Sequence, residues 1–259
     1  MKKIYGIVGH PVEHSLSPAM HNAAFRAQML NFRYLPLDTP AARGLADLKR
    51  LTRGAKFRGF SVTAPWKIAI MKHLDAVEPL ARSIGAVNTV LSDGKRLLGF
   101  NTDASGGMEA LREKLESLGR TPRGLRAAVV GAGGAARAMA HAAVRSGMEV
   151  LVSSRRPMPG RALARSVRGR WVPLPKLSRE TYEILIHCTP VGTVGKGRAG
   201  AKGIMVPPAA IKGLLESHQS AACCWNGVDR STTCIHALAR DAISEPMEKM
   251  PCNASNVSQ

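Results

Sequence analysis

The sequence predicts an α/β protein with two domains. Its 259 residues are enough for two domains of ordinary size, and its content of 45% hydrophobic and 21% charged residues is typical of a globular chain. Short apolar segments alternate with longer amphipathic ones, and this alternation resumes after a glycine-rich turn at 131–136. Such alternation is typical of β-α-β units with parallel strands.

The first half of the chain is predicted to begin with a strand at 4–8 and a helix at 17–30. Ser17 is a suitable N-cap for that helix, and Pro18 suits its first turn. The apolar face of the helix would consist of Met20, Ala23, Ala24, Ala27 and Met29 or Leu30. The other predicted elements of this half are strands at 34–37, 59–63, 86–91 and 96–100, an amphipathic segment at 40–51 and a helix at 104–118.

The second half is predicted to be a parallel α/β unit. A buried strand at 125–130 leads into the glycine turn and into an alanine-rich helix that ends near Arg145. A strand at 149–153, a helix at 161–167 and a strand at 182–186 follow.

The glycine turn predicts a dinucleotide site. Gly131 would allow the tight turn, Gly133 would let the backbone approach a pyrophosphate, and Ala136 would allow close packing of the helix. A glycine pattern alone is weak evidence, but this one follows a predicted strand and opens a predicted helix, as the motif requires. An ordinary tight turn between strand and helix is the alternative.

The end of the strand at 149–153 indicates which dinucleotide is bound. NAD sites usually carry an acidic residue there for the ribose 2′-hydroxyl, whereas this chain continues with Ser154, Arg155 and Arg156. Two guanidinium groups attract a 2′-phosphate, so the sequence favours NADP. The alternative is a basic surface loop, because residues 155–179 contain eight basic residues and no acidic one.

The charge and cysteine content exclude several classes of protein. The formal net charge is +19, which suits phosphate- and carboxylate-bearing ligands, but the 4% aromatic content and the lack of a zinc module argue against nucleic acid as the partner. Five cysteines without a C-x-x-C pair predict neither a disulfide framework nor a metal site. No apolar segment has the length of a signal peptide core or a membrane span, so we expect a cytoplasmic protein that does not bind membranes.

Four clusters of hydroxyl, amide and charged residues occupy predicted strand ends and helix starts in the first half. They read HSLSP at 14–18, SVTAPWK at 61–67, GAVNT at 85–89 and GFNTD at 99–103. Such groups suit a polyhydroxylated carboxylic acid. Together with GAGGAARA and SSR in the second half, they closely resemble the shikimate dehydrogenase family over roughly residues 4–217.

The resemblance implies an N-terminal α/β substrate domain at 1–102 and a Rossmann-type NADP-binding domain at 103–228, followed by an atypical tail at 229–259. It places the site in the cleft between the two domains. It implies NADP-dependent, reversible reduction of 3-dehydroshikimate to shikimate in aromatic amino-acid (chorismate) biosynthesis, by a monomer or homodimer. A quinate/shikimate dehydrogenase and a non-catalytic relative that binds NADP or shikimate are the alternatives.

The same resemblance assigns roles to residues of both domains. Lys67 would be the catalytic acid/base, with Asp103 as its partner on the ring hydroxyls. A cation at the carbonyl oxygen would stabilise the developing alkoxide and supply its proton. Substrate would bind to Ser15, Ser17, Ser61, Thr63, Asn88 and Asp103. NADP would bind to Gly131, Ala132, Gly133, Gly134, Ala135, Ser154, Arg155, Arg156 and Thr189.

The chain departs from the family pattern at three places. Ser61 stands where the family usually has Asn, and His187 stands where it commonly has the Asn of N-A-T-P. After about residue 217 the family's Tyr-Asp pair and G-x-x-M-L segment are missing, and four of the five cysteines lie there. We interpret this third departure as a reading-frame shift or an equivalent divergence. A metal site formed by Cys223, Cys224, Cys234 and His236 is the less favoured alternative.

Overall fold

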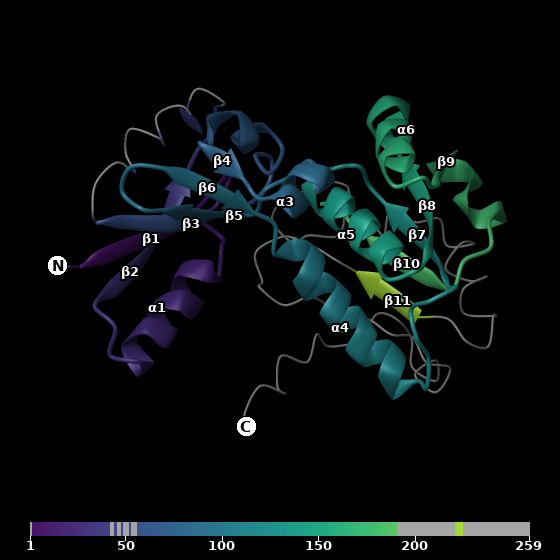
Figure 1. The fold of residues 1–259 in the computed structure, drawn as a ribbon, viewed down its shortest axis with the longest axis horizontal. Coiled ribbons are helices and arrows are strands. Elements are labelled where there is room, and N and C mark those ends of the chain that lie inside the picture. Colours follow the sequence, from purple (N-terminus) through teal and green to yellow (C-terminus); the bar gives the residue numbers. More distant parts are fainter. Residues whose placement is uncertain are drawn as a thin grey trace.

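The computed structural model describes residues 2–41, 44, 45, 48, 52, 56–190 and, for the backbone alone, 221–224. Two sheets, each with its own helices, form the two lobes visible in Figure 1. This arrangement confirms the predicted α/β class. The polar tail and most of the family-divergent C-terminal segment lie outside the described residues, as do Cys234 and His236 of the alternative metal site.

The first lobe is built on a six-stranded sheet with the order β2-β1-β3-β5-β6-β4. Strand β1 pairs in parallel with β2 and β3, whereas β5 runs antiparallel to both β3 and β6. The strands are β1 (Lys3–Gly9), β2 (Phe32–Asp38), β3 (Phe57–Val62), β4 (Ala76–Val77), β5 (Thr89–Ser92) and β6 (Leu97–Phe100). The predicted parallel alternation therefore holds for the first three strands and ends at an antiparallel hairpin.

A short connection accounts for that hairpin, since a few residues can join only antiparallel neighbours. The side-chain Oδ1 of Asp93 accepts the backbone N–H groups of Lys95 and Arg96 at 2.9 and 2.7 Å, and Gly94 has a φ of 93°. These hydrogen bonds lower the pKa of Asp93 to about 2. The strand predicted at 86–91 begins only at Thr89, so residues 86–88 form a loop before the sheet.

Helix α1 (Ser17–Ala27) packs against β1 and β2 through a face that the sequence did not predict. The predicted apolar residues Met20, Ala23, Ala24 and Ala27 are exposed, whereas His21, Asn22 and Phe25 are partly buried. Asn22 holds both backbone polar groups of Tyr34, with its Nδ2 2.9 Å from the carbonyl oxygen and its Oδ1 2.9 Å from the amide nitrogen. Hydrogen bonding and ring packing therefore orient α1, in place of an aliphatic stripe.

The predicted cap of α1 is also wrong. Leu16 occupies the N-cap position with helical dihedral angles and no side-chain cap. The hydroxyl of Ser15 instead accepts the backbone N–H of Ser17 at 3.2 Å. Ser17 lies inside the helix, one residue later than an N-cap.

Partly buried histidines give a testable dependence of stability on pH. Burial lowers the pKa of His21 and, together with the charge of Arg137, that of His141 below 6.5. As pH falls through 6.5, the unfolded chain takes up protons that the folded chain does not, so the free energy of unfolding decreases. The variant His21→Gln/His141→Gln should lose less thermal stability than the parent chain between about pH 7.5 and 5.5. His14→Gln, at an exposed histidine, is the matched control, and equal slopes for all three proteins would contradict the prediction.

The second lobe contains a parallel sheet with the order β11-β10-β7-β8-β9. The strands are β7 (Arg126–Val130), β8 (Glu149–Ser154), β9 (Arg170–Pro173), β10 (Ile184–His187) and β11 (Ala221–Cys224). Strands β7 and β10 are buried along most or all of their length, as expected for parallel strands covered on both faces.

The remaining helices connect and cover these sheets. They are the 3₁₀ segments η1 (Ala69–His73) and η2 (Leu174–Arg179) and the α-helices α3 (Pro79–Ile84), α4 (Asp103–Ser117), α5 (Gly134–Arg145) and α6 (Pro157–Ser166). Helices α4, α5 and α6 contribute to one hydrophobic core on a face of the second sheet, which also includes Ile84 and Ala86 from the first lobe. The lobes therefore share part of one core. In the segment predicted at 40–51, Gly44, Leu45 and Leu48 are helical, and most other residues lie outside the described part.

Candidate active site

Lys67 and Asp103 form an ion pair where the two lobes meet. Lys67 follows β3, and Asp103 is the first residue of α4. The Lys67 Nζ lies 2.6 Å from the Asp103 Oδ2, and the two side chains are only 12% and 10% exposed. The structure thus brings together the two residues assigned to catalysis, which are 36 positions apart in the sequence.

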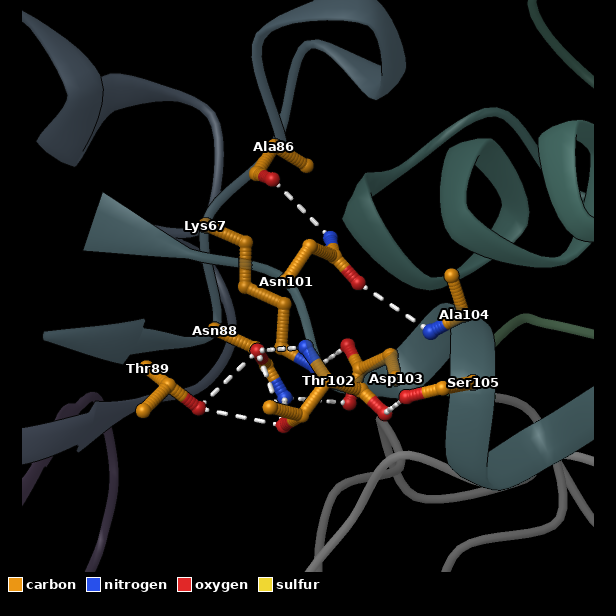
Figure 2. A network of polar contacts seen from close by, with 9 residues as sticks. All are labelled: Lys67, Ala86, Asn88, Thr89, Asn101, Thr102, Asp103, Ala104 and Ser105. Carbon is orange, nitrogen blue, oxygen red and sulfur yellow. Dashed lines mark hydrogen bonds and ion pairs between the residues drawn. The ribbon is translucent and has the colours of Figure 1, made fainter. Parts of the chain in front are cut away.

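Asn88 holds the other oxygen of the carboxylate. Its Nδ2 donates to the Asp103 Oδ1 at 2.8 Å and to the Thr102 Oγ1 at 2.9 Å, and its Oδ1 accepts the backbone N–H of Thr102 at 2.8 Å. Figure 2 shows Lys67, Asn88 and Asp103 converging on one point. Each carboxylate oxygen therefore has a protein partner, and the side chain has a fixed orientation.

Asn101 supports this site and was not among the predicted residues. It is 4% exposed, its Nδ2 donates to the carbonyl of Ala86 at 2.9 Å, and its Oδ1 accepts the backbone N–H of Ala104 at 3.1 Å. Asn101 thus caps the first turn of α4 and ties it to the loop that carries Asn88, as Figure 2 shows. The Asn-Thr-Asp run was visible in the sequence, but only the structure distinguishes the capping asparagine from a ligand-binding one.

The ion pair leaves hydrogen-bonding capacity for a ligand. A lysine ammonium has three N–H donors, and Asp103 is the acidic partner of Lys67 within the described residues. A ketone oxygen placed beside the ammonium would face both a positive charge and a proton donor. The arrangement suits stabilisation and protonation of an alkoxide.

The predicted hydroxyl ligands lie at the same end of the first sheet. Ser15 and Ser17 stand at the start of α1, and Ser61 and Thr63 stand at the end of β3. Ser61 accepts a hydrogen bond of 2.8 Å from the hydroxyl of Tyr34, and Thr63 is 8% exposed. Sequence reasoning identified Ser61 but missed Tyr34, because the contact crosses the intervening strand β1.

The glycine turn has the geometry of a dinucleotide site. Gly131 has a φ of +127°, which favours glycine, and a Cβ there would lie 2.7 Å from the carbonyl oxygen of Cys188. Gly133 is the N-cap of α5, and a Cβ on it would meet no atom of the described residues within 4 Å. The turn therefore directs the amino end of α5, with its N–H groups, toward a region that a pyrophosphate can approach. Ala132 and Ala135 are partly buried, and Ala136 is fully buried as predicted.

Gly134 is the point of closest approach between the glycine turn and the ion pair. A Cβ on Gly134 would lie 2.6 Å from the Cβ of Lys67. Since real Cβ atoms do not come this close, only glycine lets Lys67 occupy its place. The start of α5 and the candidate acid/base are therefore in direct contact across the lobes.

The end of β8 presents two arginines and no acidic residue. Arg155 and Arg156 are exposed directly before α6, whose positive amino end adds to their attraction for an anion. Ser154 is buried, and its hydroxyl donates to the carbonyl of Arg156 at 2.8 Å and accepts the indole N–H of Trp171 at 3.0 Å. The Ser154 side chain therefore shapes this loop from inside.

Thr189 lies just beyond the end of β10. Its hydroxyl is 2.8 Å from the Nε2 of His187, which is 4% exposed. His187 therefore fits into the structure as a buried neighbour of the predicted cofactor residue.

The described part of the chain has no group of three or more side chains that could hold a metal ion. It also has no helix that is long and apolar enough to cross a membrane. A cavity of about 550 Å³ lies at the amino ends of β7, β8 and β9, the edge opposite the glycine turn. None of the predicted site residues lines it.

Comparison with known proteins gives a consistent result. Residues 7–90 match the family model described as the shikimate dehydrogenase substrate binding domain. The chain is 42% identical over 223 residues to the shikimate dehydrogenase (NADP(+)) of Citrifermentans bemidjiense, across 80% of this chain and 74% of that protein. It is similar to the crystal structure of the shikimate 5-dehydrogenase from Thermus thermophilus in complex with NADP(H) and shikimate, with a TM-score of 0.61 and 42% identity over 73% of this chain and 69% of that one. The quinate dehydrogenase from Corynebacterium glutamicum in complex with NAD matches with a TM-score of 0.66 and 29% identity, over 79% of this chain and 74% of that one.

Proposed function

The chain belongs to the shikimate dehydrogenase family, and from this membership we propose that its Lys67–Asp103 pair catalyses the NADP-dependent, reversible reduction of 3-dehydroshikimate to shikimate. This reaction is a step of aromatic amino-acid biosynthesis. The observation that carries the proposal is the ion pair of 2.6 Å, shielded from solvent at the junction of the lobes.

In the direction of reduction, Lys67 donates a proton to the oxygen of the substrate carbonyl. NADPH, when held by the glycine turn and the arginines of the second lobe, would supply the hydride to the carbonyl carbon. The Lys67 ammonium stabilises the negative charge that develops on the oxygen and then transfers its proton there. Asp103 orients the ammonium and accepts a hydrogen bond from a neighbouring ring hydroxyl. In the reverse direction, neutral Lys67 takes the proton of the shikimate hydroxyl.

The remaining hydroxyl and amide groups bind the substrate. We assign the substrate carboxylate to Ser15 and Ser17, and the ring hydroxyls to Ser61, Thr63, Asn88 and Asp103. The position of these groups at the carboxyl end of the first sheet and the start of α1 supports this assignment. The capping contact of Ser15 with the backbone of Ser17 leaves the Ser15 proton available for an anion.

The residues of the second lobe bind NADP. We assign the pyrophosphate to the turn from Gly131 to Ala135, and the 2′-phosphate to Arg155 and Arg156 with Ser154 shaping their loop. Thr189 lies on the neighbouring strand end and would contact the nicotinamide half. The exposed arginines and the absence of an acid beside them in 154–156 support NADP over NAD.

The assay for this function follows the absorbance of reduced nicotinamide at about 340 nm. Purified protein is mixed with shikimate or quinate and with NADP or NAD. We expect the signal to grow with shikimate and NADP. Growth with quinate and NAD alone would favour a quinate dehydrogenase, and folded protein that binds shikimate without turnover would favour a non-catalytic relative.

Removal of both arginines should change the cofactor preference. Because Arg155 and Arg156 provide the positive charge for the 2′-phosphate, the variant Arg155→Ala/Arg156→Ala should raise the KM for NADP by about 10- to 100-fold and leave the KM for NAD nearly unchanged. Steady-state kinetics with both cofactors measures this. Arg165→Ala, at an exposed arginine of α6, is the control. An unchanged ratio of the KM values for NADP and NAD would contradict the assignment of Arg155 and Arg156 to the 2′-phosphate.

Three finer points remain proposals. We place the domain boundary at 102/103 and the end of the cofactor domain at 228, with an atypical tail at 229–259. The active form is a monomer or a homodimer, which size-exclusion chromatography distinguishes. The third is a cytoplasmic location, which is in keeping with five cysteines that form no C-x-x-C pair.

A further inference from the structure

The hydroxyl of Tyr34 donates a hydrogen bond of 2.8 Å to the Oγ of Ser61. We propose that Tyr34 is a positioning residue that orients Ser61 as a hydrogen-bond donor to the substrate. The inference rests on the proposed function, because Ser61 is one of the residues assigned to shikimate.

The Tyr34 side chain is buried, and contacts with α1 fix its position. Tyr34 is 4% exposed in β2 and stacks on His21 with ring centroids 4.4 Å apart and an angle of 17°. Asn22 binds both the N–H and the C=O of its backbone. The phenol hydroxyl therefore has a fixed place from which it reaches Ser61 across β1, the strand that lies between β2 and β3.

The donation by Tyr34 determines what the serine can do. A serine hydroxyl has one proton and two lone pairs, and Tyr34 occupies one of the lone pairs. The Ser61 proton must then point away from the phenol. No acceptor for this proton is found among the described residues, and Ser61 is partly exposed, so an oxygen of a bound ligand is the natural acceptor.

Ser61 also lies beside the catalytic network. It is paired with Thr89 in the register of β3 and β5, and Thr89 donates to the Oδ1 of Asn88 at 3.1 Å. Thr63 comes two residues after Ser61, just beyond the end of β3. The donor is thus placed between the buried tyrosine and the groups assigned to the substrate hydroxyls.

Comparison with an asparagine side chain shows what the contact with Tyr34 contributes to Ser61. The two N–H donors of an asparagine amide lie in the plane of the amide group, so their directions are fixed by the side chain itself. A serine hydroxyl rotates freely, and a fixed donor on one side restricts its proton to the other side. Tyr34 therefore supplies to Ser61 the directionality that an amide has by itself.

A double-mutant cycle tests the inference through shikimate binding measured by calorimetry, which does not require turnover. Tyr34→Phe and Ser61→Ala should each raise the Kd for shikimate by about three- to tenfold, as expected for one hydrogen bond. The double variant should be no worse than Ser61→Ala alone, because Tyr34 acts through Ser61. The Kd for NADP should stay close to that of the parent chain, because neither residue is among those assigned to the cofactor.

The matched control is Tyr5→Phe, which removes a phenol hydroxyl from the neighbouring strand on the same face of the sheet. It should leave the Kd for shikimate unchanged. Additive effects of the two site variants, or an unchanged Kd in Tyr34→Phe, would overturn the inference. Ser61→Asn in the Tyr34→Phe background should restore binding, and its failure in a folded protein would also count against the role of Tyr34.

The outcomes separate this inference from the proposed function. If the parent chain binds shikimate without oxidising it, the catalytic proposal fails while the cycle still decides the role of Tyr34. If the parent chain binds NADP but not shikimate, both proposals are wrong. If turnover is normal and the cycle shows no coupling, only the role of Tyr34 is wrong.

Discussion

Replacing Lys67 with alanine should lower kcat by between about 10² and 10⁴-fold, because the reaction loses both its proton donor and the charge that stabilises the alkoxide. The KM for NADP should change little, because the Lys67 ammonium is paired with Asp103, and the Lys67 Cβ that lies beside Gly134 is kept in alanine. Steady-state rates of shikimate oxidation measure the first quantity, and NADP titration measures the second.

Two controls make this result specific. Lys72→Ala removes an exposed lysine from η1 and should leave kcat unchanged. Asp103→Asn keeps the shape of the partner and removes its charge, and should lower kcat by a smaller factor than Lys67→Ala. Retention of kcat within tenfold in Lys67→Ala, or equal losses of kcat and NADP affinity, would contradict the acid/base role.

Replacing Gly134 with alanine should lower kcat by about 10²-fold while the chain stays folded. The new Cβ would lie 2.6 Å from the Cβ of Lys67, so either the lysine or the start of α5 must move. A displacement of about 1 Å in a reacting group is enough for a loss of this size. Steady-state kinetics measures the loss of kcat, and thermal unfolding of the same preparation shows whether the chain is folded.

Gly106→Ala in α4 is the matched control for this substitution. A Cβ on Gly106 meets no atom of the described residues within 4 Å, and Gly106 is exposed. Alanine favours the helix by roughly 0.5–1 kcal/mol over glycine, so this variant should keep full activity and be slightly more stable. Full activity of Gly134→Ala would show that the contact with Lys67 does not limit catalysis.

The ion pair and most strands were predictable from the sequence for different reasons. Strand and helix positions depend on the local periodicity of apolar residues, which can be recognised directly in the sequence. The convergence of Lys67 and Asp103 is not local and was implied only by the resemblance of their motifs to a known family. The structure then placed them 2.6 Å apart.

The errors arise where polar residues do the packing. Alanine occurs so often in α1 that the helix is apolar on several faces. The spacing of Met20, Ala23, Ala24 and Ala27 therefore predicted the face that is exposed to solvent instead of the face that packs on the sheet. His21, Asn22 and Phe25 face the sheet because they stack on rings or bind the backbone of Tyr34. The supporting roles of Asn101 and Tyr34 were not predicted for a related reason, because each role depends on a contact that only the tertiary structure creates.

The ion pair has a consequence for the exchange of domains between relatives. Lys67 belongs to the substrate lobe, while Asp103 opens the helix that leads into the cofactor lobe. A chimaera joined between residues 102 and 103 would take its aspartate from one parent and its lysine, Asn88 and Asn101 from the other. A junction placed after the first turn of α4 would keep the complete pair and its supports from a single parent, so it suits an exchange of lobes better than the proposed boundary at 102/103.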